Sequence, residues 1–377
     1  MNVLVLSAYA AQSHVHWQQS LQAMFAQWQW RVLSLPPRHF SWRVRGNALF
    51  WSIAERDTLE QPYDLVVATS MVDLATLRGL VPALARVPTI VYFHENQFEY
   101  PQDQQKHSLL EAQMTSIYSA LAADRIVFNS GYNRDSFLAG CSALMSKLPD
   151  RVPPGVALML QGRATILPVP FDSRDYESVA PLWPGASERL IERPFRLLWV
   201  GRFEHDKGGE GLLRILRRLE AESLDYELAM TGQQFRVSPA VFSEIKSLFG
   251  HRLVQFGYVD CIAEYRALLQ AADVVLSTAI HEFQGLAVME AVAHRCHPIV
   301  PDRLAYPEMY PALNRYDSCP NDPEREADAA VALILKMAAE PLSNVAQYPD
   351  VSCFGLGPMA PRYERLFRQV AVVQDSQ

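Results

Sequence analysis

The chain has 377 residues, of which 49% are hydrophobic, and a formal net charge of −7. One hydrophobic core usually stops growing at about 250 to 300 residues, so this length predicts two domains. The net charge disfavours nucleic-acid binding over the whole surface, and any such contact must be local.

The sequence predicts no signal peptide, no membrane span and no disulfide framework. Residues 1–7 are apolar, without a positively charged region or a small-residue cleavage site, so we expect no signal peptide. No run of about 18 apolar residues predicts a membrane span. The five cysteines are scattered, which fits reduced thiols and neither a disulfide framework nor a zinc site. We therefore expect a cytoplasmic protein, and the sequence leaves its oligomeric state open.

Short apolar runs alternate with helix-like stretches along the chain, which predicts parallel sheets covered on both faces. The runs of the first half are 3–6, 32–35, 65–68, 89–93, 126–128 and 165–169. Those of the second half are 197–200, 228–230, 253–256, 274–277 and 298–300. The predicted fold class is α/β, with two Rossmann-like, doubly wound parallel-sheet domains facing a central cleft. The predicted parts are a domain at 1–170, a linker at 171–194, a domain at 195–350, and a C-terminal helix within 351–377 that packs back toward the first domain.

Polar residues follow several strands of the first domain. Ser13 and His14 come after the first strand, the run from His94 to Gln97 follows the fourth, and Asn129 follows the fifth. Parallel sheets bind ligands at the carboxyl ends of their strands. A lone histidine is more often structural, but this cluster is polar where a buried loop could not be, which favours a role in the cleft.

The segment 31–51 interleaves Arg31, Arg38, Arg43 and Arg45 with Phe40, Trp42, Phe50 and Trp51, and it contains no acid. Bases can stack on such rings while phosphates meet the cations. The alternative is a loop whose aromatic side chains fill the core and whose arginines are solvated.

Two elements of the second domain suit an anionic ligand. The strand at 197–200 leads into a loop in which Arg202 and Lys207 precede two glycines. The strand near 272–278 leads to Glu282, Gly285 and Glu290, so one carboxylate precedes a predicted helix and the other lies inside it. Gly285 allows close backbone approach, and the unpaired N–H groups at a helix start favour a phosphate. The alternative is that Arg202 and Lys207 pair with Glu204 and Asp206 on an ordinary surface.

These stretches resemble the tRNA-queuosine mannosyltransferase family, a branch of the retaining, two-Rossmann-domain (GT-B) glycosyltransferases. The matching residues, in family order, are 13–14, 35–36, 42–45, 92–97, 127–130, 203–207 and 277–283. The resemblance implies a donor domain at 195–350 that binds GDP-mannose and an acceptor domain at 1–170. It implies transfer, with retention, of mannose to a cyclopentenediol hydroxyl of queuosine in the tRNA(Asp) anticodon. No DxD-type motif stands at a strand end, so we expect metal-independent catalysis without a cofactor.

The resemblance also assigns roles to residues. The expected catalytic residues are Glu282, His94, Lys207 and Arg202. The expected donor-binding residues are Arg202, Lys207, Glu282, Phe283, Gln284, Gly285, Leu286 and Glu290. The expected acceptor-binding residues are Ser13, His14, Arg43, Arg45, His94, Glu95, Asn96, Gln97 and Asn129.

Two departures from the family pattern leave other readings open. Ala11 and Gln12 stand where the family has a glycine pair, and Arg295 replaces a glycine near a helix end, where a left-handed conformation is common. One alternative is a non-catalytic RNA- or nucleotide-binding module on a decayed transferase fold. Another is a retaining glycosyltransferase that uses a different nucleotide sugar and a saccharide or lipid acceptor.

Overall fold

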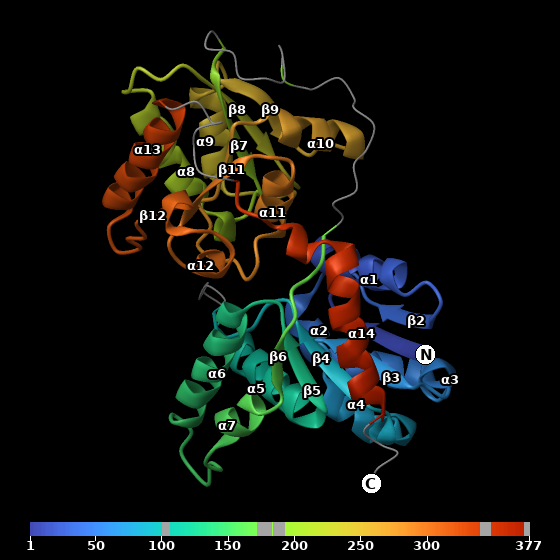
Figure 1. Cartoon of the computed structure of the whole chain (residues 1–377). Coiled ribbons are helices and arrows are strands. Elements are labelled where there is room, and N and C mark those ends of the chain that lie inside the picture. The colour runs from blue at the N-terminus through green and yellow to red at the C-terminus, as the bar shows by residue number, and fades with distance from the viewer. Residues whose placement is uncertain (100–105, 172–182, 184–192, 340–347, 373–377) are drawn as a thin grey trace. The chain divides into compact units, whose positions relative to one another are not determined.

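The computed structural model describes residues 1–99, 106–171, 183, 193–339 and 348–372. It divides into two compact units, unit 1 with residues 1–172 and 354–377 and unit 2 with residues 173–353. Each unit contains one six-stranded parallel sheet (Figure 1). The predicted fold class of two doubly wound parallel-sheet domains is therefore confirmed. The predicted linker falls almost entirely on residues outside the described ones.

Unit 1 has the strand order β2-β1-β3-β4-β5-β6. Its strands are β1 (Asn2–Ser7), β2 (Gln29–Ser34), β3 (Leu65–Thr69), β4 (Thr89–Phe93), β5 (Arg125–Phe128) and β6 (Ala164–Ile166). Its helices are α1 (Gln12–Met24), α2 (Phe40–Ala54), α3 (Arg56–Leu59), α4 (Leu74–Leu80), α5 (Lys106–Ala122), α6 (Gly131–Met145), α7 (Val156–Gln161) and α14 (Leu356–Val372).

Unit 2 has the strand order β12-β11-β10-β7-β8-β9. Its strands are β7 (Phe195–Val200), β8 (Tyr226–Thr231), β9 (Leu253–Gly257), β10 (Val274–Leu276), β11 (His297–Pro301) and β12 (Arg315–Tyr316). Its helices are α8 (Gly209–Leu219), α9 (Ala240–Leu248), α10 (Ile262–Ala271), α11 (Leu286–Ala293), α12 (Tyr306–Met309) and α13 (Pro323–Ala339). The sequence did not reveal β12, because two residues are too short for a periodic pattern.

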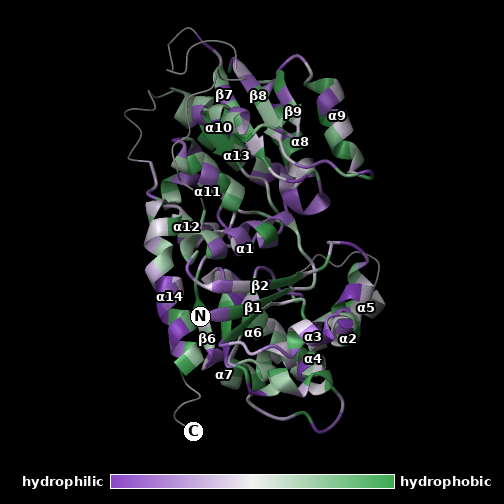
Figure 2. Cartoon of the chain, turned by 90° about the vertical axis from the view of Figure 1, so that its right-hand side faces the viewer, coloured by the Kyte–Doolittle hydropathy of each residue, from purple (hydrophilic) through white to green (hydrophobic). Residues whose placement is uncertain are grey.

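The apolar strands lie inside each unit. Every residue of β3, β4, β10 and β11 is buried, as expected for parallel strands covered by helices on both faces. The hydrophobic colour in Figure 2 accordingly runs along the strands of each unit. The sheets thus form rigid supports whose carboxyl ends carry the polar loops.

Helix α14 belongs to unit 1 and lies beside α1 (Figure 1). The hydroxyl of Tyr363 accepts a hydrogen bond from Trp17 Nε1 at 3.1 Å and donates to the carbonyl of Pro168 at 2.9 Å. Tyr92 Oη lies 3.3 Å from the same hydroxyl. These hydrogen bonds are buried, so α14 supplies the partner for Trp17 Nε1 and for the Pro168 carbonyl.

We expect Tyr363→Phe to lower the free energy of unfolding by about 1 to 3 kcal/mol, because it leaves a buried donor and a buried acceptor unpaired. Tyr118→Phe on α5 is the matched control, since this side chain is 51% exposed. Urea unfolding followed by circular dichroism measures both. Equal unfolding midpoints for the two variants would contradict this account of α14.

Candidate functional site

The two charged loops of unit 2 lie at the same sheet edge. Strands β7 and β10 are neighbours and parallel, so the loops that follow Val200 and Leu276 leave the sheet side by side. The first loop carries Arg202 and Lys207, and the second carries Glu282. The structure therefore brings together the residues expected to bind the donor.

Backbone contacts hold these two loops against each other. The N–H groups of Ile280 and His281 donate to the carbonyl of Asp206 at 3.0 and 3.2 Å. The hydroxyl of Thr278 donates to the carbonyl of Lys207 at 2.9 Å. Gly208 has a φ of 71°, and a Cβ on it would lie 1.8 Å from the Thr278 carbonyl oxygen. Only glycine fits this contact, which explains its position directly after Lys207.

The expected donor cations are paired with acids. Lys207 Nζ lies 2.9 Å from Glu282 Oε2, and Asp206 lies 3.3 Å away. Arg202 pairs with Glu204 at 2.7 Å and with Asp206 at 3.2 Å. The alternative, in which Arg202 and Lys207 pair with Glu204 and Asp206, is thus present in the structure. Lys207 also pairs with Glu282, a second predicted site residue. Two cations and three carboxylates share this edge, and both cations are paired with acids.

Charge and burial shift the pKa values of these groups. Burial would raise the pKa of Glu282, but the Lys207 ammonium group and the N–H groups of Gly285 and Gln284 hold it at about 2. Burial would lower the pKa of Lys207, but Glu282 and Asp206 raise it. Both groups are therefore ionised at neutral pH. Burial raises the pKa of the Glu204 carboxyl, against the lowering effect of Arg202.

The start of α11 is shaped by Gly285. This residue has a φ of 78° and caps the helix, and a Cβ on it would lie 3.0 Å from the Tyr306 ring. The N–H groups of Phe283 and Gln284 donate to Glu282 Oε1 at 3.1 and 3.4 Å. Glu282 itself therefore uses part of the anion-binding capacity that we expected to find open at this turn.

The rest of α11 carries the second carboxylate. Leu286, partly exposed, begins the helix, and Glu290 lies in its second turn. The hydroxyl of Tyr265 on α10 donates to Glu290 Oε2 at 3.1 Å and orients it. This partner could not be predicted from the sequence, because no motif includes it. Past the helix, Arg295 does adopt the left-handed conformation, with a φ of 69°, despite its side chain.

In unit 1, His94 directly follows β4 and is only 5% exposed. Its ring lies 4.1 Å from that of His14, measured between centroids, and 4.9 Å from Trp17. His14 Nε2 lies 3.1 Å from Glu95 Oε2. Burial and the neighbouring His14 lower the pKa of His94 well below 6.5, so its imidazole is neutral. Ser13, in the first turn of α1, is exposed.

Buried amides fix the loop that carries His94. Asn129 Nδ2 donates to the His94 carbonyl at 2.8 Å, and Asn133 Nδ2 donates to Asn129 Oδ1 at 2.8 Å. Asn96 Nδ2 lies 2.9 Å from Asn133 Oδ1, and Asn96 Oδ1 accepts from a backbone N–H. Gln97 is buried as well. The buried amides of Asn96 and Asn129 thus hold this loop, and acceptor binding by Asn96, Gln97 and Asn129 stays a prediction. Asn133, which joins them, was missed because it lies inside α6.

The segment 31–51 is mainly strand and helix, and not the loop that we considered. Arg45 on α2 pairs with Asp73 at 2.7 Å and with Glu111 at 3.6 Å, acids that come from elsewhere in the chain. Arg43 is half-buried, and its Nε has no hydrogen-bond partner within the described part of the chain. Trp51 is buried, whereas Trp42 is exposed. The alternative, in which the aromatic side chains fill the core, therefore holds for Trp51 and fails for Trp42.

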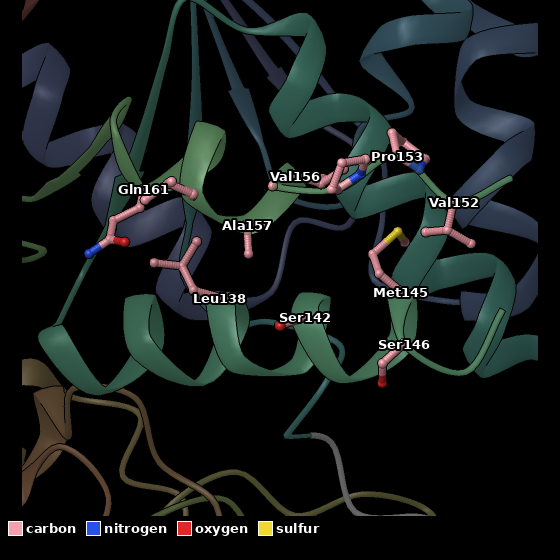
Figure 3. Close-up of a pocket in the computed structure, with 12 residues that line it drawn as sticks. Leu138, Ser142, Met145, Ser146, Val152, Pro153, Val156, Ala157 and Gln161 are labelled. Atoms are coloured by element: carbon pink, nitrogen blue, oxygen red, sulfur yellow. The ribbon is translucent and has the colours of Figure 1, made fainter.

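A separate hollow of about 520 Å³ lies in unit 1. Leu138, Ser142 and Met145 of α6 face Val156 and Ala157 of α7 across it (Figure 3). Its lining includes none of the expected site residues. A second cavity of about 280 Å³ in unit 2 adjoins the paired loops and includes Glu204, Gly208 and Thr278 in its lining.

The described residues contain neither a candidate metal-binding cluster nor a helix that could span a membrane. No group of three or more His, Cys, Asp or Glu side chains there could hold a metal ion. None of the helices in that part of the chain has the length and apolar character needed to cross a membrane.

We expect Gly208→Ala to destabilise unit 2 by at least about 1 to 2 kcal/mol, the cost of a left-handed non-glycine residue, before the clash with Thr278 is counted. Gly211→Ala is the matched control, because its Cβ would meet only Thr278 Cβ at 3.7 Å. Thermal unfolding of both variants is the measurement. A Gly208→Ala protein as stable as the control would show that the loops do not depend on this contact.

Comparison with known proteins follows the same division of the chain. The family model described as tRNA-queuosine alpha-mannosyltransferase N-terminal matches residues 2–171, and the model described as glycosyl transferases group 1 matches residues 194–336. The tRNA-queuosine alpha-mannosyltransferase of Drosophila melanogaster is 35% identical over 289 residues, which cover 76% of each chain.

Solved structures show the same fold at low sequence identity. Sucrose-phosphate synthase from Thermosynechococcus elongatus has a TM-score of 0.70 at 15% identity and covers 98% of this chain and 99% of its own. Anabaena HepE in complex with UDP and glucose has a TM-score of 0.67 at 14% identity, over 98% of this chain and 100% of its own. The chain is thus a glycosyltransferase of the GT-B fold, and it belongs to the tRNA-queuosine alpha-mannosyltransferase family.

Proposed function

We propose that this enzyme transfers mannose from GDP-mannose, with retention of configuration, to queuosine in the anticodon of tRNA(Asp). The observation that carries the proposal is the match of the family-specific N-terminal model over 2–171 together with the Drosophila relative, whose name specifies both mannose and tRNA queuosine. The guanine base of the donor and the identity of the tRNA rest on the family resemblance alone.

Unit 2 supplies the residues for the donor. Arg202 and Lys207 contact the diphosphate, Glu282 orients the sugar hydroxyls, and Glu290 binds the ribose. Lys207 Nζ now has three acceptors, namely Glu282, Asp206 and the His281 carbonyl. Donor binding replaces at least one of them with a phosphate oxygen. The phosphate therefore binds less strongly than it would to an unpaired lysine. This weaker binding favours release of the nucleotide after transfer.

Retention follows from a front-face reaction. The bond from the anomeric carbon to the donor phosphate breaks as the bond to the queuosine oxygen forms on the same face. The acceptor proton passes to the leaving phosphate. Arg202 and Lys207 stabilise the charge on that phosphate, a contribution of about 2.7 to 4 kcal/mol for one preorganised contact.

His94 acts in this proposal as a neutral imidazole. Its lowered pKa excludes an imidazolium at neutral pH, so it serves as a hydrogen-bond partner for the sugar and not as a positive charge. The tilted contact of its ring with that of His14, and the contact of His14 with Glu95, fix the orientation of the ring.

Mannose transfer tests the proposed function directly. Purified protein should transfer radiolabelled mannose from GDP-mannose to tRNA(Asp) that contains queuosine and not to the same tRNA with guanosine at that position. We propose that the cations replace a metal, so transfer should persist in EDTA. Equal transfer from UDP-glucose would reject the donor, transfer to unmodified tRNA would reject the acceptor, and rescue by Mg²⁺ would reject the metal-free mechanism.

Lys207→Ala should lower kcat by about 10²- to 10³-fold, because one preorganised contact to the leaving group is lost. Lys246→Ala on the surface of α9 is the matched control and should keep wild-type kcat. Steady-state kinetics with GDP-mannose measures both, and circular dichroism checks that each variant is folded. A Lys207→Ala enzyme with wild-type kcat would remove Lys207 from the site.

A further inference from the structure

Helix α2 exposes an apolar stripe, which we define as Trp42, Leu49, Phe50 and Ile53. The opposite face of the helix buries Val44, Ala48 and Trp51 in the core of unit 1, whereas the stripe residues are 47 to 74% exposed. Their spacing places them along one side of the helix, because residues three and four apart share a face. An exposed apolar surface of several large side chains in a row indicates a contact with a partner.

Gly46 fixes the position of the largest of these side chains. A Cβ on Gly46 would lie 2.4 to 2.7 Å from three atoms of the Trp42 indole, Cε2, Cδ2 and Cζ2. Such similar distances mean that one face of the ring covers the Gly46 backbone, while the side chain stays 58% exposed. Glycine inside a helix costs about 0.5 to 1 kcal/mol relative to alanine. The helix thus accepts a less stable residue at the place where the indole rests.

The charge around the stripe suits a polyanion. The first 54 residues contain four arginines and no aspartate or glutamate. Arg38 and His39 are exposed beside the start of α2, and Arg43 is half-buried in its first turn. No acid pairs with Arg38 or Arg43 among the residues that the structure describes. A cationic rim next to a flat aromatic ring fits the phosphates and bases of single-stranded RNA better than it fits an apolar protein surface.

The location of Trp42 links the stripe to the predicted acceptor residues. Helix α2 begins beyond the carboxyl end of β2, and the Phe40 ring meets the Tyr9 ring edge-on, with centroids 6.0 Å apart. Tyr9 lies in the loop after β1 that leads to His14. Trp42 therefore stands at the edge of the unit 1 sheet where His14 and His94 lie.

We propose that Trp42, held flat on Gly46, is a stacking platform for an unpaired base of the acceptor RNA, with Arg38 and Arg43 contacting the adjacent phosphates. The proposal rests on the proposed function in that it takes the acceptor to be RNA. Sequence-specific RNA recognition usually takes place at loops, where unpaired bases stack on aromatic side chains. An anticodon loop offers such bases on either side of the modified nucleotide.

Three variants test the platform through tRNA affinity, measured by titration independently of transfer. Loss of base stacking should weaken tRNA binding by about 5- to 100-fold in Trp42→Ala. Trp42→Phe should retain most of the affinity. Gly46→Ala should weaken binding because its methyl group displaces the indole, while its thermal stability stays equal or rises. Leu158→Ala, on α7 of the same unit and 72% exposed, is the control with wild-type affinity.

Salt dependence tests the neighbouring cation. Arg43→Ala should lower the slope of log K against log[salt] by about 0.7, the value for one phosphate contact on a single strand. An unchanged slope would remove Arg43 from the platform.

The outcomes separate this proposal from the proposed function. If Trp42→Ala and Gly46→Ala bind tRNA as the wild type does, the platform is rejected, even where mannose transfer is observed. If both variants bind weakly while the wild type transfers no mannose, the platform stands and the proposed function fails. If the wild type binds no tRNA, both are rejected. Loss of self-association in Trp42→Ala, with tRNA affinity intact, would instead identify the stripe as a contact between two copies of the chain.

Discussion

The ion pair between Lys207 and Glu282 is the interaction on which the arrangement of unit 2 depends. It joins the loop after β7 to the loop after β10, and the close contact of Gly208 with Thr278 allows the two loops to approach far enough for it. The same carboxylate accepts hydrogen bonds from the first N–H groups of the turn before α11. One acidic side chain thereby sets the position of a lysine, a turn and a helix start. A ligand that enters this region meets charged groups whose positions are already set.

Unit 1 is organised on another principle. Here the neutral buried amides of Asn96, Asn129 and Asn133 position the loop after β4. The result is a neutral imidazole at the end of β4, beside a histidine that contacts Glu95. The strand-end loops therefore differ, because ion pairs join the two loops of unit 2 whereas buried amides hold the loop that carries His94 in unit 1.

The sequence predicted the fold well because parallel strands, buried on both faces, are continuous apolar runs that need no knowledge of their neighbours. It also predicted that Lys207 and Glu282 both follow strands of the second sheet, but it did not predict that the two side chains pair. It did not predict that Asp73 and Glu111 pair with Arg45, because those acids lie 28 and 66 positions away in the chain. Tyr265 and Asn133 were missed for the same reason: each acts through a contact that packing creates. Arg295 adopts a left-handed conformation that its residue type disfavours, while the N–H groups of Arg295 and Cys296 bond to carbonyls at the end of α11.

The hydrogen bond between Trp17 and Tyr363 spans 346 positions of the chain. During synthesis, the indole of Trp17 leaves the ribosome long before its partner does. Unit 2 is encoded between them and has its own core, so it can fold while the first 172 residues still lack α14. The half of the protein that is made first is therefore completed last, because its α14-binding face stays uncovered until residues 356–372 have been made.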